Sequence, residues 1–415
     1  MTGYTQPRTD TVLLHILQGG HDSLFREVLR NPQTFRLQVI YTQVNRDRHN
    51  VPSFTNYYFN YDPALYFNPA SIVKLPAAFL ALEKLKTIHK KKVNKYTPVQ
   101  FDSSYPKQTA ALYDSTSESG FPSIAHYIKK AFLVSDNDAY NRLYEFIGQQ
   151  GFNKTLREKG YYNIRITRQF RGFTAEQNRV TNQVRFIKED GRLIYLQPPA
   201  YNTDSFHFPS VIKLGKAYYN SNDSLINEPM NFTEHNYISL EDFQQILQSV
   251  MLPTSVPASQ RFNISKDDRK FLLQFLSQYP SETNYPKYDT SKYYDSYVKF
   301  FFKNESHRVP DGIRIFNKVG WSYGFLTDAS YIVDFKNKLE FMLSATLYVN
   351  SDGILNDDRY EYDQTGYPFL YQLGQIIYHY ELQRKRTYLP DLSDFRIKYE
   401  KRKEDARKSL REINN

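Results

Sequence analysis

The chain has 415 residues, of which 40% are hydrophobic and 16% aromatic, with a formal net charge of +10 and no cysteine. Its length suits two joined lobes, and its apolar content excludes a largely disordered chain. The absence of cysteine excludes disulfides, thiol catalysis and thiolate metal sites. Much of the charge lies in residues 384–415, which hold 11 Lys/Arg and 6 Asp/Glu without basic and aromatic residues interleaved. We expect a solvated helix or frayed tail there, and no nucleic-acid binding.

The N-terminal part predicts short helices, a hairpin and a buried helix, in that order. Residues 9–32 read as helical segments ended by Gly and Pro. Residues 35–62 contain two strand-like runs around a polar turn, which indicates a β-hairpin. From Ile72 to Leu82 the chain is apolar on every face, which predicts a fully buried helix. No apolar run reaches ~18 residues, so no membrane span is expected, and the start lacks an apolar signal core, which indicates either retention inside the cell or a removed leader.

The C-terminal part returns to strands after a mostly helical region. Helices with Ser-x-x-Asp starts are predicted from Ser239 and Ser265. Residues 313–349 predict three strands, and residues 367–386 a closing helix. The expected fold is therefore α+β: a five-stranded antiparallel sheet flanked by helices, with an inserted all-helical lobe. The expected parts are an α/β lobe (9–70 and 311–386), a helical lobe with the central helix and an enlarged insertion (71–310), and a charged tail (387–415).

Ser71 and Lys74 stand three residues apart where the buried helix begins. On a helix, residues i and i+3 share a face, so the hydroxyl and the amine can meet. The unpaired N–H groups of a first helical turn favour a nucleophilic oxygen and an oxyanion, and a desolvated lysine can act as base toward the serine. The same tetrad recurs at Ser210–Lys213, so the motif alone does not identify a site.

Other catalytic motifs are missing from the sequence. The nine histidines include no HExxH, and there is neither a GxSxG elbow nor a phosphate-binding Gly-rich loop. We therefore expect no metal and no cofactor. A serine–histidine–aspartate triad stays open, although no motif indicates one.

A second candidate element, Ser135–Asp136–Asn137, follows Ser71 by 64 residues. In an extended loop, Ser135 and Asn137 would both face the cleft while Asp136 braces the loop. The alternative is a helix start with Ser135 or Asp136 as N-cap. Both descriptions are compatible, because the loop can lead into the helix.

A third candidate element is Lys318 with Gly320, on a predicted strand. Glycine lets a substrate approach the backbone closely beside the ammonium group, and the next N–H group, of Trp321, is a plausible oxyanion donor. The alternative is an ordinary hairpin with a surface lysine. Lys213 and Gly215 mimic this element, but only the Ser71 set has all three elements in order.

Ser-x-x-Lys, Ser-Asp-Asn and Lys-x-Gly in this order resemble the class A β-lactamases and the penicillin-binding proteins, a superfamily of serine acyltransferases. The stretches "VSDNDAYNRLYEFIG" and "KVGWSYGFLTDASYIVDF" resemble the class A-related serine hydrolases of Bacteroidetes-type bacteria, and the likeness runs from about residue 35 to about residue 380. The resemblance implies that Ser71 forms an acyl-enzyme, with a site between two lobes. It further implies that Lys74 takes or relays the serine proton, that Ser135 passes a proton to the leaving nitrogen and that Asn137 holds the substrate amide. By the same resemblance, Lys318 binds a carboxylate and helps keep Lys74 neutral. The N–H groups of Ser71 and Trp321 would form the oxyanion hole.

Two departures from the family pattern concern the substrate carboxylate and deacylation. Val319 stands where the family usually carries a hydroxyl residue, so Ser322 or Tyr323 is the candidate replacement. For the deacylating glutamate the candidate is Glu176, with Asn178 or Asn182 as a water-holding partner; the alternative is a solvated loop glutamate. The long stretch from residue 183 to residue 310 is expected to add helical structure that reshapes the cleft.

The expected activity is β-lactam hydrolysis through an acyl-enzyme, with a role in antibiotic resistance. The alternatives are a D-Ala-D-Ala-type peptidase, transpeptidase or esterase on the same scaffold, and a penicillin-binding or sensor domain without turnover. The expected partner is a β-lactam or a peptidoglycan-like compound. The resemblance implies a periplasmic or otherwise exported protein, and the sequence predicts no oligomeric state.

Overall fold

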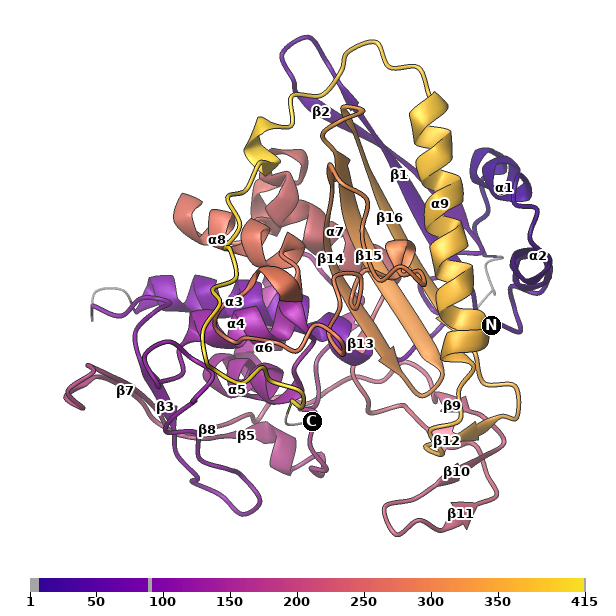
Figure 1. The fold of residues 1–415 in the computed structure, drawn as a ribbon. Helices are drawn as coiled ribbons and strands as arrows, with labels where there is room; N and C mark the ends of the chain where they lie inside the picture. Colours follow the sequence, from indigo (N-terminus) through magenta and orange to yellow (C-terminus); the bar gives the residue numbers. More distant parts are fainter. Residues whose placement is uncertain (1–6, 89–91, 414–415) are drawn as a thin grey trace. The chain divides into compact units, whose positions relative to one another are not determined.

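The computed structural model describes residues 7–88 and 92–413, which divide into two compact units (Figure 1). Unit 1 comprises residues up to Ile72, Phe208–Ser255 and Ser296–Arg396, and unit 2 comprises Val73–His207, Val256–Asp295 and the residues from Ile397 onward. The segment 208–255, expected in the helical lobe, thus groups with the sheet. Within the described ranges, none of the helices combines the length and the apolarity needed to cross a membrane. In the same ranges, no group of three or more His, Asp or Glu side chains is arranged to hold a metal ion.

Unit 1 is built on a five-stranded antiparallel sheet in the order β14-β15-β16-β1-β2. Strand β1 pairs with β16, for example Thr42 with Met342, so strands from both ends of the chain join in one sheet. The predicted five-stranded sheet and N-terminal hairpin are confirmed. The strands are β1 (Gln38–Arg46), β2 (Pro52–Phe59), β14 (Ile313–Ser322), β15 (Phe325–Asp334) and β16 (Leu339–Tyr348).

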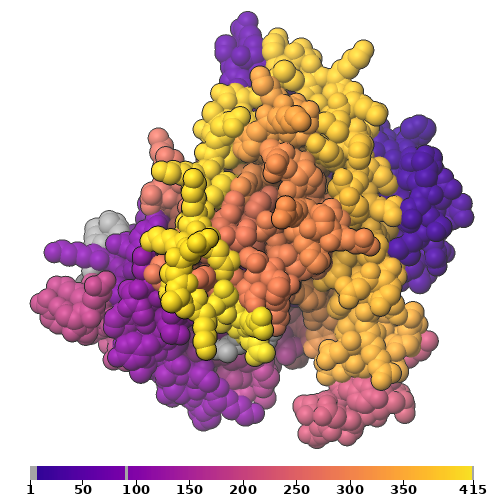
Figure 2. Space-filling view, viewed as in Figure 1, coloured from indigo at the N-terminus to yellow at the C-terminus, as the bar shows by residue number. Residues whose placement is uncertain are grey.

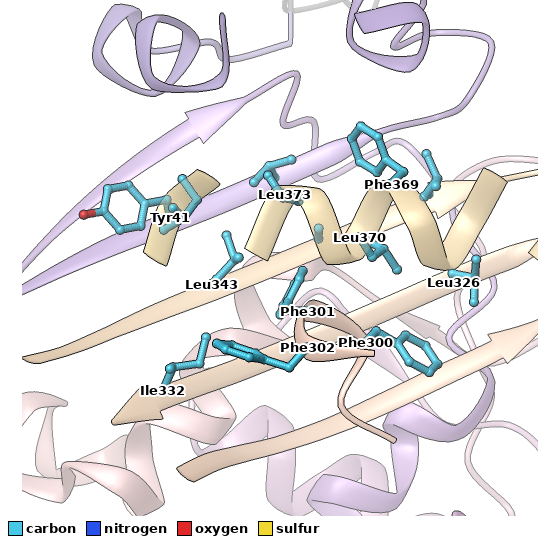
Figure 3. Packing of buried hydrophobic residues seen from close by; sticks show 14 of the residues in the cluster. Tyr41, Phe300, Phe301, Phe302, Leu326, Ile332, Leu343, Phe369, Leu370 and Leu373 are labelled. Atoms are coloured by element: carbon cyan, nitrogen blue, oxygen red, sulfur yellow. The ribbon is translucent and has the colours of Figure 1, made fainter. Parts of the chain in front are cut away.

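Helices cover both faces of this sheet. On one face, Tyr41 and Leu343 pack in the main core with Leu370 of α9 (Figure 3). On the other face, Gln244 of α7 hydrogen-bonds Thr42 and Ser344, which alternate with the core residues because strand side chains point to opposite faces. The helices of unit 1 are α1 (Thr11–Gln18), α2 (Ser23–Arg30), α7 (Leu240–Met251) and α9 (Tyr367–Gln383).

The segment 208–238 of unit 1 forms short strands, so the expectation of added helical structure there is wrong. Strands β9 and β12 pair, and β10 pairs with β11 and β17. The side chain of Asn220 accepts hydrogen bonds from the N–H groups of Asn222 and Ser224, which favours a tight turn over a helix. The strands are β9 (Lys213–Leu214), β10 (Ala217–Tyr219), β11 (Leu225–Ile226), β12 (Met230–Asn231), β13 (Tyr237–Ile238) and β17 (Ile354–Leu355).

In its described residues, unit 2 contains five α-helices and, in addition, short strands, so the lobe expected to be all-helical is mixed. Its strands pair as β3-β6-β7 and β5-β8. The predicted start of α8 is confirmed, because Ser265 and Asp268 form a reciprocal capping box. The helices are α3 (Lys74–Thr87), α4 (Ile124–Leu133), α5 (Asn137–Ile147), α6 (Gln149–Glu158) and α8 (Lys266–Ser277), and the strands are β3 (Val99–Phe101), β4 (Ile164–Arg165), β5 (Val180–Thr181), β6 (Val184–Ile187), β7 (Leu193–Gln197) and β8 (Ala200–Tyr201).

The C-terminal segment is docked, so the expectation of a solvated helix or frayed tail is wrong. Beyond the short turn Ser393–Phe395 the chain up to residue 413 forms no helix, and Figure 2 shows it in yellow on the surface. The backbone N–H of Leu410 donates to the carbonyl of Lys287 at 2.7 Å. The guanidinium of Arg407 donates to the carbonyl of Asn284 at 3.0 Å. The segment thus satisfies its polar groups against residues 284–289 instead of in a helix of its own.

Candidate active site

Ser71 lies in a 3₁₀ turn, Ala70–Val73, that leads directly into α3. Ala70 has a positive φ of 44°, a conformation that costs a non-glycine residue about 1 kcal/mol or more. The side chain of Asn68 supports it by accepting a hydrogen bond from the N–H of Ala70 at 2.9 Å. The turn therefore holds Ser71, which is 9% exposed, in a strained and supported geometry of the kind found at functional sites.

Strand β14 of unit 1 packs directly against this turn through Gly320. A Cβ atom at this position would lie 2.5 Å from the carbonyl oxygen of Pro69 and 3.0 Å from the backbone nitrogen of Ile72. Only glycine permits this approach, which is the reason for its place in the motif. The close approach brings the backbone that continues into Trp321 beside the turn that carries Ser71.

The alternation of β14 separates the residues of the Lys-x-Gly motif into two faces. Val319 is fully buried in the main core, and the ring of Trp321 packs against that core as well. Lys318, Gly320 and Ser322 share the opposite face. Lys318 is 1% exposed, and its ammonium group donates to the carbonyl of Val319 at 2.8 Å. Ser322 therefore has a hydroxyl on the same strand face as Lys318. Val319 lies on the opposite face and has no hydroxyl.

Lys74 begins α3 of unit 2 and is completely buried. Its ammonium nitrogen lies 2.7 Å from the amide oxygen of Asn137 and 3.3 Å from the hydroxyl of Ser135, and it also donates to the backbone carbonyl of Ser135. The ring of Phe170 lies 5.2 Å from the same nitrogen. Burial lowers the pKa of Lys74 to about 7, against the opposing effect of the Asp136 carboxylate. A lysine that is partly neutral at pH 7 is able to accept a proton.

The Ser135–Asn137 loop leads into α5 as the helix-start description expects, and it is not extended, because Asn137 already belongs to the helix. Asp136 is the N-cap of α5, and its side chain accepts a hydrogen bond from the N–H of Ala139 at 2.8 Å. Ser135 has a positive φ of 63°, and Ser135 and Asn137 both contact Lys74. The first two candidate elements are thus brought together at the amine of Lys74.

A known protein family matches the part of the chain that carries the first two motifs. Residues 31–190 match the model described as the beta-lactamase enzyme family, and this range includes Ser71, Lys74, Ser135 and Asn137. The chain is thus similar to this family over residues 31–190. No curated protein matches it.

Solved structures similar to this chain include three β-lactamases. The enzyme of Francisella tularensis is 14% identical, with a TM-score of 0.49 and coverage of 86% of this chain and 99% of that one. The enzyme of Burkholderia ambifaria is 12% identical, with a TM-score of 0.48 and coverage of 88% and 100%. The enzyme of Xanthomonas campestris is 13% identical, with a TM-score of 0.47 and coverage of 85% and 97%.

Glu176, the candidate for the deacylating glutamate, has the contacts of a solvated loop residue. Its side chain is 68% exposed and lies 3.9 Å from the guanidinium of Arg179, and it is hydrogen-bonded to Tyr201. Among the residues that the structure describes, these are its polar contacts, and Lys74 is not one of them. The structure therefore favours the solvated-loop interpretation of Glu176 over the catalytic one.

The two asparagines proposed to hold a water beside Glu176 bond to other groups. The amide oxygen of Asn178 accepts from the N–H of Gln169 at 2.8 Å, and its nitrogen donates to the carbonyl of Thr174 at 2.9 Å. Asn182 accepts from the N–H of Ser104 at 2.9 Å. Sequence reasoning missed Phe170, the ring beside Lys74, because nothing distinguishes it from the other aromatic residues of the chain.

Proposed function

We propose that this protein is a serine hydrolase of the β-lactamase type, in which Ser71 forms an acyl-enzyme with a β-lactam. The observation that carries the proposal is the amine of Lys74, which is completely buried, stands three residues after Ser71 and has a pKa of about 7. At neutral pH roughly half of such amines are unprotonated, close to the optimum for a general base.

Acylation follows from the chemistry of these groups. The hydroxyl oxygen of Ser71 attacks the carbonyl carbon of the lactam amide, and its proton passes to the amine of Lys74. The N–H groups of Ser71 and Trp321 stabilise the oxyanion of the tetrahedral intermediate. When the carbon–nitrogen bond breaks, the leaving nitrogen receives a proton from Ser135, whose hydroxyl is replenished from Lys74. The amine is then neutral again and the acyl group remains on Ser71.

Three further side chains would orient the substrate. Lys318 would pair with the carboxylate that β-lactams carry, and Ser322 would donate a hydrogen bond to it from the same strand face. Asn137 would hold the amide of the acyl side chain. Val319 contributes no hydrogen bond, so carboxylate binding rests on Lys318 and Ser322.

Deacylation requires a base that activates water, and the solvated position of Glu176 favours a second candidate function. In this alternative the protein is acylated by penicillins but releases the product slowly, as a penicillin-binding or sensor protein does. The observation that favours it is the 68% exposure of the Glu176 side chain, with Arg179 as its ionic partner.

One experiment separates these functions. The protein is incubated with a chromogenic cephalosporin and with labelled penicillin, and its intact mass is then measured. Rapid colour without a lasting adduct supports hydrolysis, and a persistent adduct that Ser71→Ala abolishes supports slow turnover. Absence of both colour and adduct overturns β-lactam recognition and leaves a peptidase, transpeptidase or esterase acting on another acyl compound.

We further propose that the protein acts outside the cytoplasm on β-lactams or peptidoglycan-like compounds and contributes to antibiotic resistance. The support is the relationship to the β-lactamase family over residues 31–190. The test is expression of the full-length gene in a susceptible bacterium, followed by cell fractionation and measurement of the minimal inhibitory concentration of a penicillin. An unchanged inhibitory concentration, with the protein present in the periplasm, contradicts the role in resistance.

A further inference from the structure

A row of buried ionic contacts supports the Ser135–Asn137 loop within unit 2. The ammonium group of Lys130, on α4, lies 3.5 Å from the carboxylate of Asp136 and 3.2 Å from that of Asp114. The ring of His126, one helical turn earlier on α4, lies 3.2 Å from the same oxygen of Asp114. The four side chains are between 1% and 14% exposed. The contacts thus run without a break from α4 to the middle residue of the Ser-Asp-Asn motif.

Lys130 holds Asp136 at two points. Besides the ionic contact of its side chain, its backbone carbonyl accepts a hydrogen bond from the N–H of Asp136 at 3.3 Å. The other carboxylate oxygen of Asp136 is engaged by the N–H of Ala139 as the N-cap of α5. The loop is therefore fixed between the end of α4 and the start of α5.

Ser135 needs such support because of its backbone conformation. Its φ of 63° is unfavourable for a residue with a side chain, and such a conformation persists only where the surroundings impose it. In this conformation both its carbonyl and its hydroxyl contact the amine of Lys74. A small relaxation of the loop would therefore move the hydroxyl away from the base.

Lys130 and Asp114 stay charged in spite of their burial. Burial works to lower the pKa of Lys130, but the carboxylates of Asp136 and Asp114 outweigh it and raise that pKa. Asp114 accepts two hydrogen bonds from Thr116, at 2.6 Å from its hydroxyl and 2.9 Å from its N–H. The hydrogen bond from His126, the charge of Lys130 and the bond from Thr116 keep the pKa of Asp114 well below its usual range, although burial opposes them.

We propose that Lys130 is a positioning residue for acyl transfer: it holds Asp136, and through it the strained Ser135, against Lys74, while Asp114, which also contacts His126, holds Lys130. The inference rests on the proposed function, because it assigns the support of the same site. If Lys130 has this role, substituting it should slow acylation more than a substitution elsewhere in unit 2 that destabilises the protein to the same extent.

The test compares Lys130→Met with Lys95→Met. Lys95 is a matched control, because it is also a buried lysine between two carboxylates, Asp267 and Asp268, but these belong to the first turn of α8. Lys130→Met removes the lysine partner of the buried Asp136 and Asp114, and Lys95→Met removes that of Asp268 and of the exposed Asp267, so both substitutions should lower the melting temperature. We expect Lys130→Met to slow acylation by labelled penicillin about a hundredfold, Lys95→Met to change it less than about twofold, and Lys130→Arg to restore most of the rate. Equal acylation rates in Lys130→Met and Lys95→Met overturn the proposal.

Two additional measurements keep the inference testable. If Lys130→Met does not fold, Asp114→Asn replaces it, with an expected tenfold loss of rate, on the order of what one hydrogen bond to a charged group supports. Amide hydrogen exchange of residues 135–139 reads the loop independently of activity, and it should accelerate in Lys130→Met but not in Lys95→Met. A wild-type protein that forms no adduct overturns the proposed function alone, whereas unchanged exchange in Lys130→Met overturns the positioning role alone.

Discussion

The two Ser-x-x-Lys tetrads of this chain have the same spacing and different structures. Ser71 stands in a turn that continues into a helix, and Lys74 is completely buried. Ser210 stands in an irregular, extended stretch, and Ser210 and Lys213 are both exposed. Only the first pair combines a helical spacing with a lysine removed from water. The proposed base chemistry therefore fits only the first tetrad, where the fold desolvates the lysine.

The sequence around each tetrad explains the difference. An apolar run follows Ser71, so the helix that starts there is buried on every side and takes Lys74 with it. Lys213 instead begins the short strand β9, with β10 next along the chain, so no helix forms after Ser210 and the lysine remains in solvent. The two tetrads share the spacing of serine and lysine and differ in the burial of the lysine. Paired substitutions at the two tetrads therefore test whether spacing or burial determines the acylation rate.

The largest contrast is expected for the serines. Ser71→Ala removes the proposed nucleophile, so acylation by labelled penicillin should fall on the order of a thousandfold or more. Ser210→Ala removes an exposed hydroxyl and should leave the acylation rate unchanged. Intact-mass spectrometry over time measures both. Adduct formation at the wild-type rate in Ser71→Ala would show that the site assignment is wrong.

The lysines should differ by a somewhat smaller factor. Lys74→Met removes the proposed base, so the acylation rate should fall about a hundred- to ten-thousandfold, the range of general base catalysis. Lys213→Met should acylate at the wild-type rate. Rates from single-turnover mixing, with melting temperatures as the control for folding, give the comparison. Similar rates for the two variants would exclude Lys74 as the base.

Most of the fold was predictable because periodic patterns determine it. The alternating runs of the hairpin, the three C-terminal strands and the capped helices at Ser239 and Ser265 are all present. The segment 208–238 escaped prediction because its strands have two or three residues, too few for a pattern to show. The docking of the C-terminal segment depends on single hydrogen bonds to distant residues, such as that of Leu410 to Lys287, which no local pattern encodes.

The three motifs of the site were predictable from the sequence, but the residues that support them were not. The order of the three motifs singled out Ser71, and Ser135 and Asn137 lie within hydrogen-bond distance of Lys74, while the catalytic roles expected for them stay predictions. Glu176 was chosen on chain distance alone, and chain distance does not report exposure. Lys130 sits in a helix among other lysines, and its partner Asp114 comes from a separate loop, so sequence offers no signal for the pair.

The pH dependence of acylation distinguishes a buried base from a solvated one. Burial lowers the pKa of Lys74 to about 7, and only the neutral amine accepts the proton of Ser71. The acylation rate should therefore fall about tenfold per pH unit below pH 7 and reach a plateau above about pH 8. The rate of adduct formation between pH 5 and pH 9 measures the profile. A rate that still rises about tenfold per pH unit up to pH 9 would mean that Lys74 behaves like a solvated lysine.

The smallest contrast is between the glycines of the two Lys-x-Gly elements, Gly320 after Lys318 and Gly215 after Lys213. A Cβ atom at Gly320 would lie 2.5 Å from the carbonyl of Pro69, and one at Gly215, whose φ is +76°, would lie 2.7 Å from the carbonyl of Gly353. Each alanine substitution should therefore lower the free energy of unfolding by about 1–3 kcal/mol. Only Gly320→Ala displaces the turn that carries Ser71, so it alone should slow acylation, by about tenfold. Denaturant unfolding and single-turnover acylation measure the two effects separately, and equal acylation rates in the two variants would show that β14 does not set the position of Ser71.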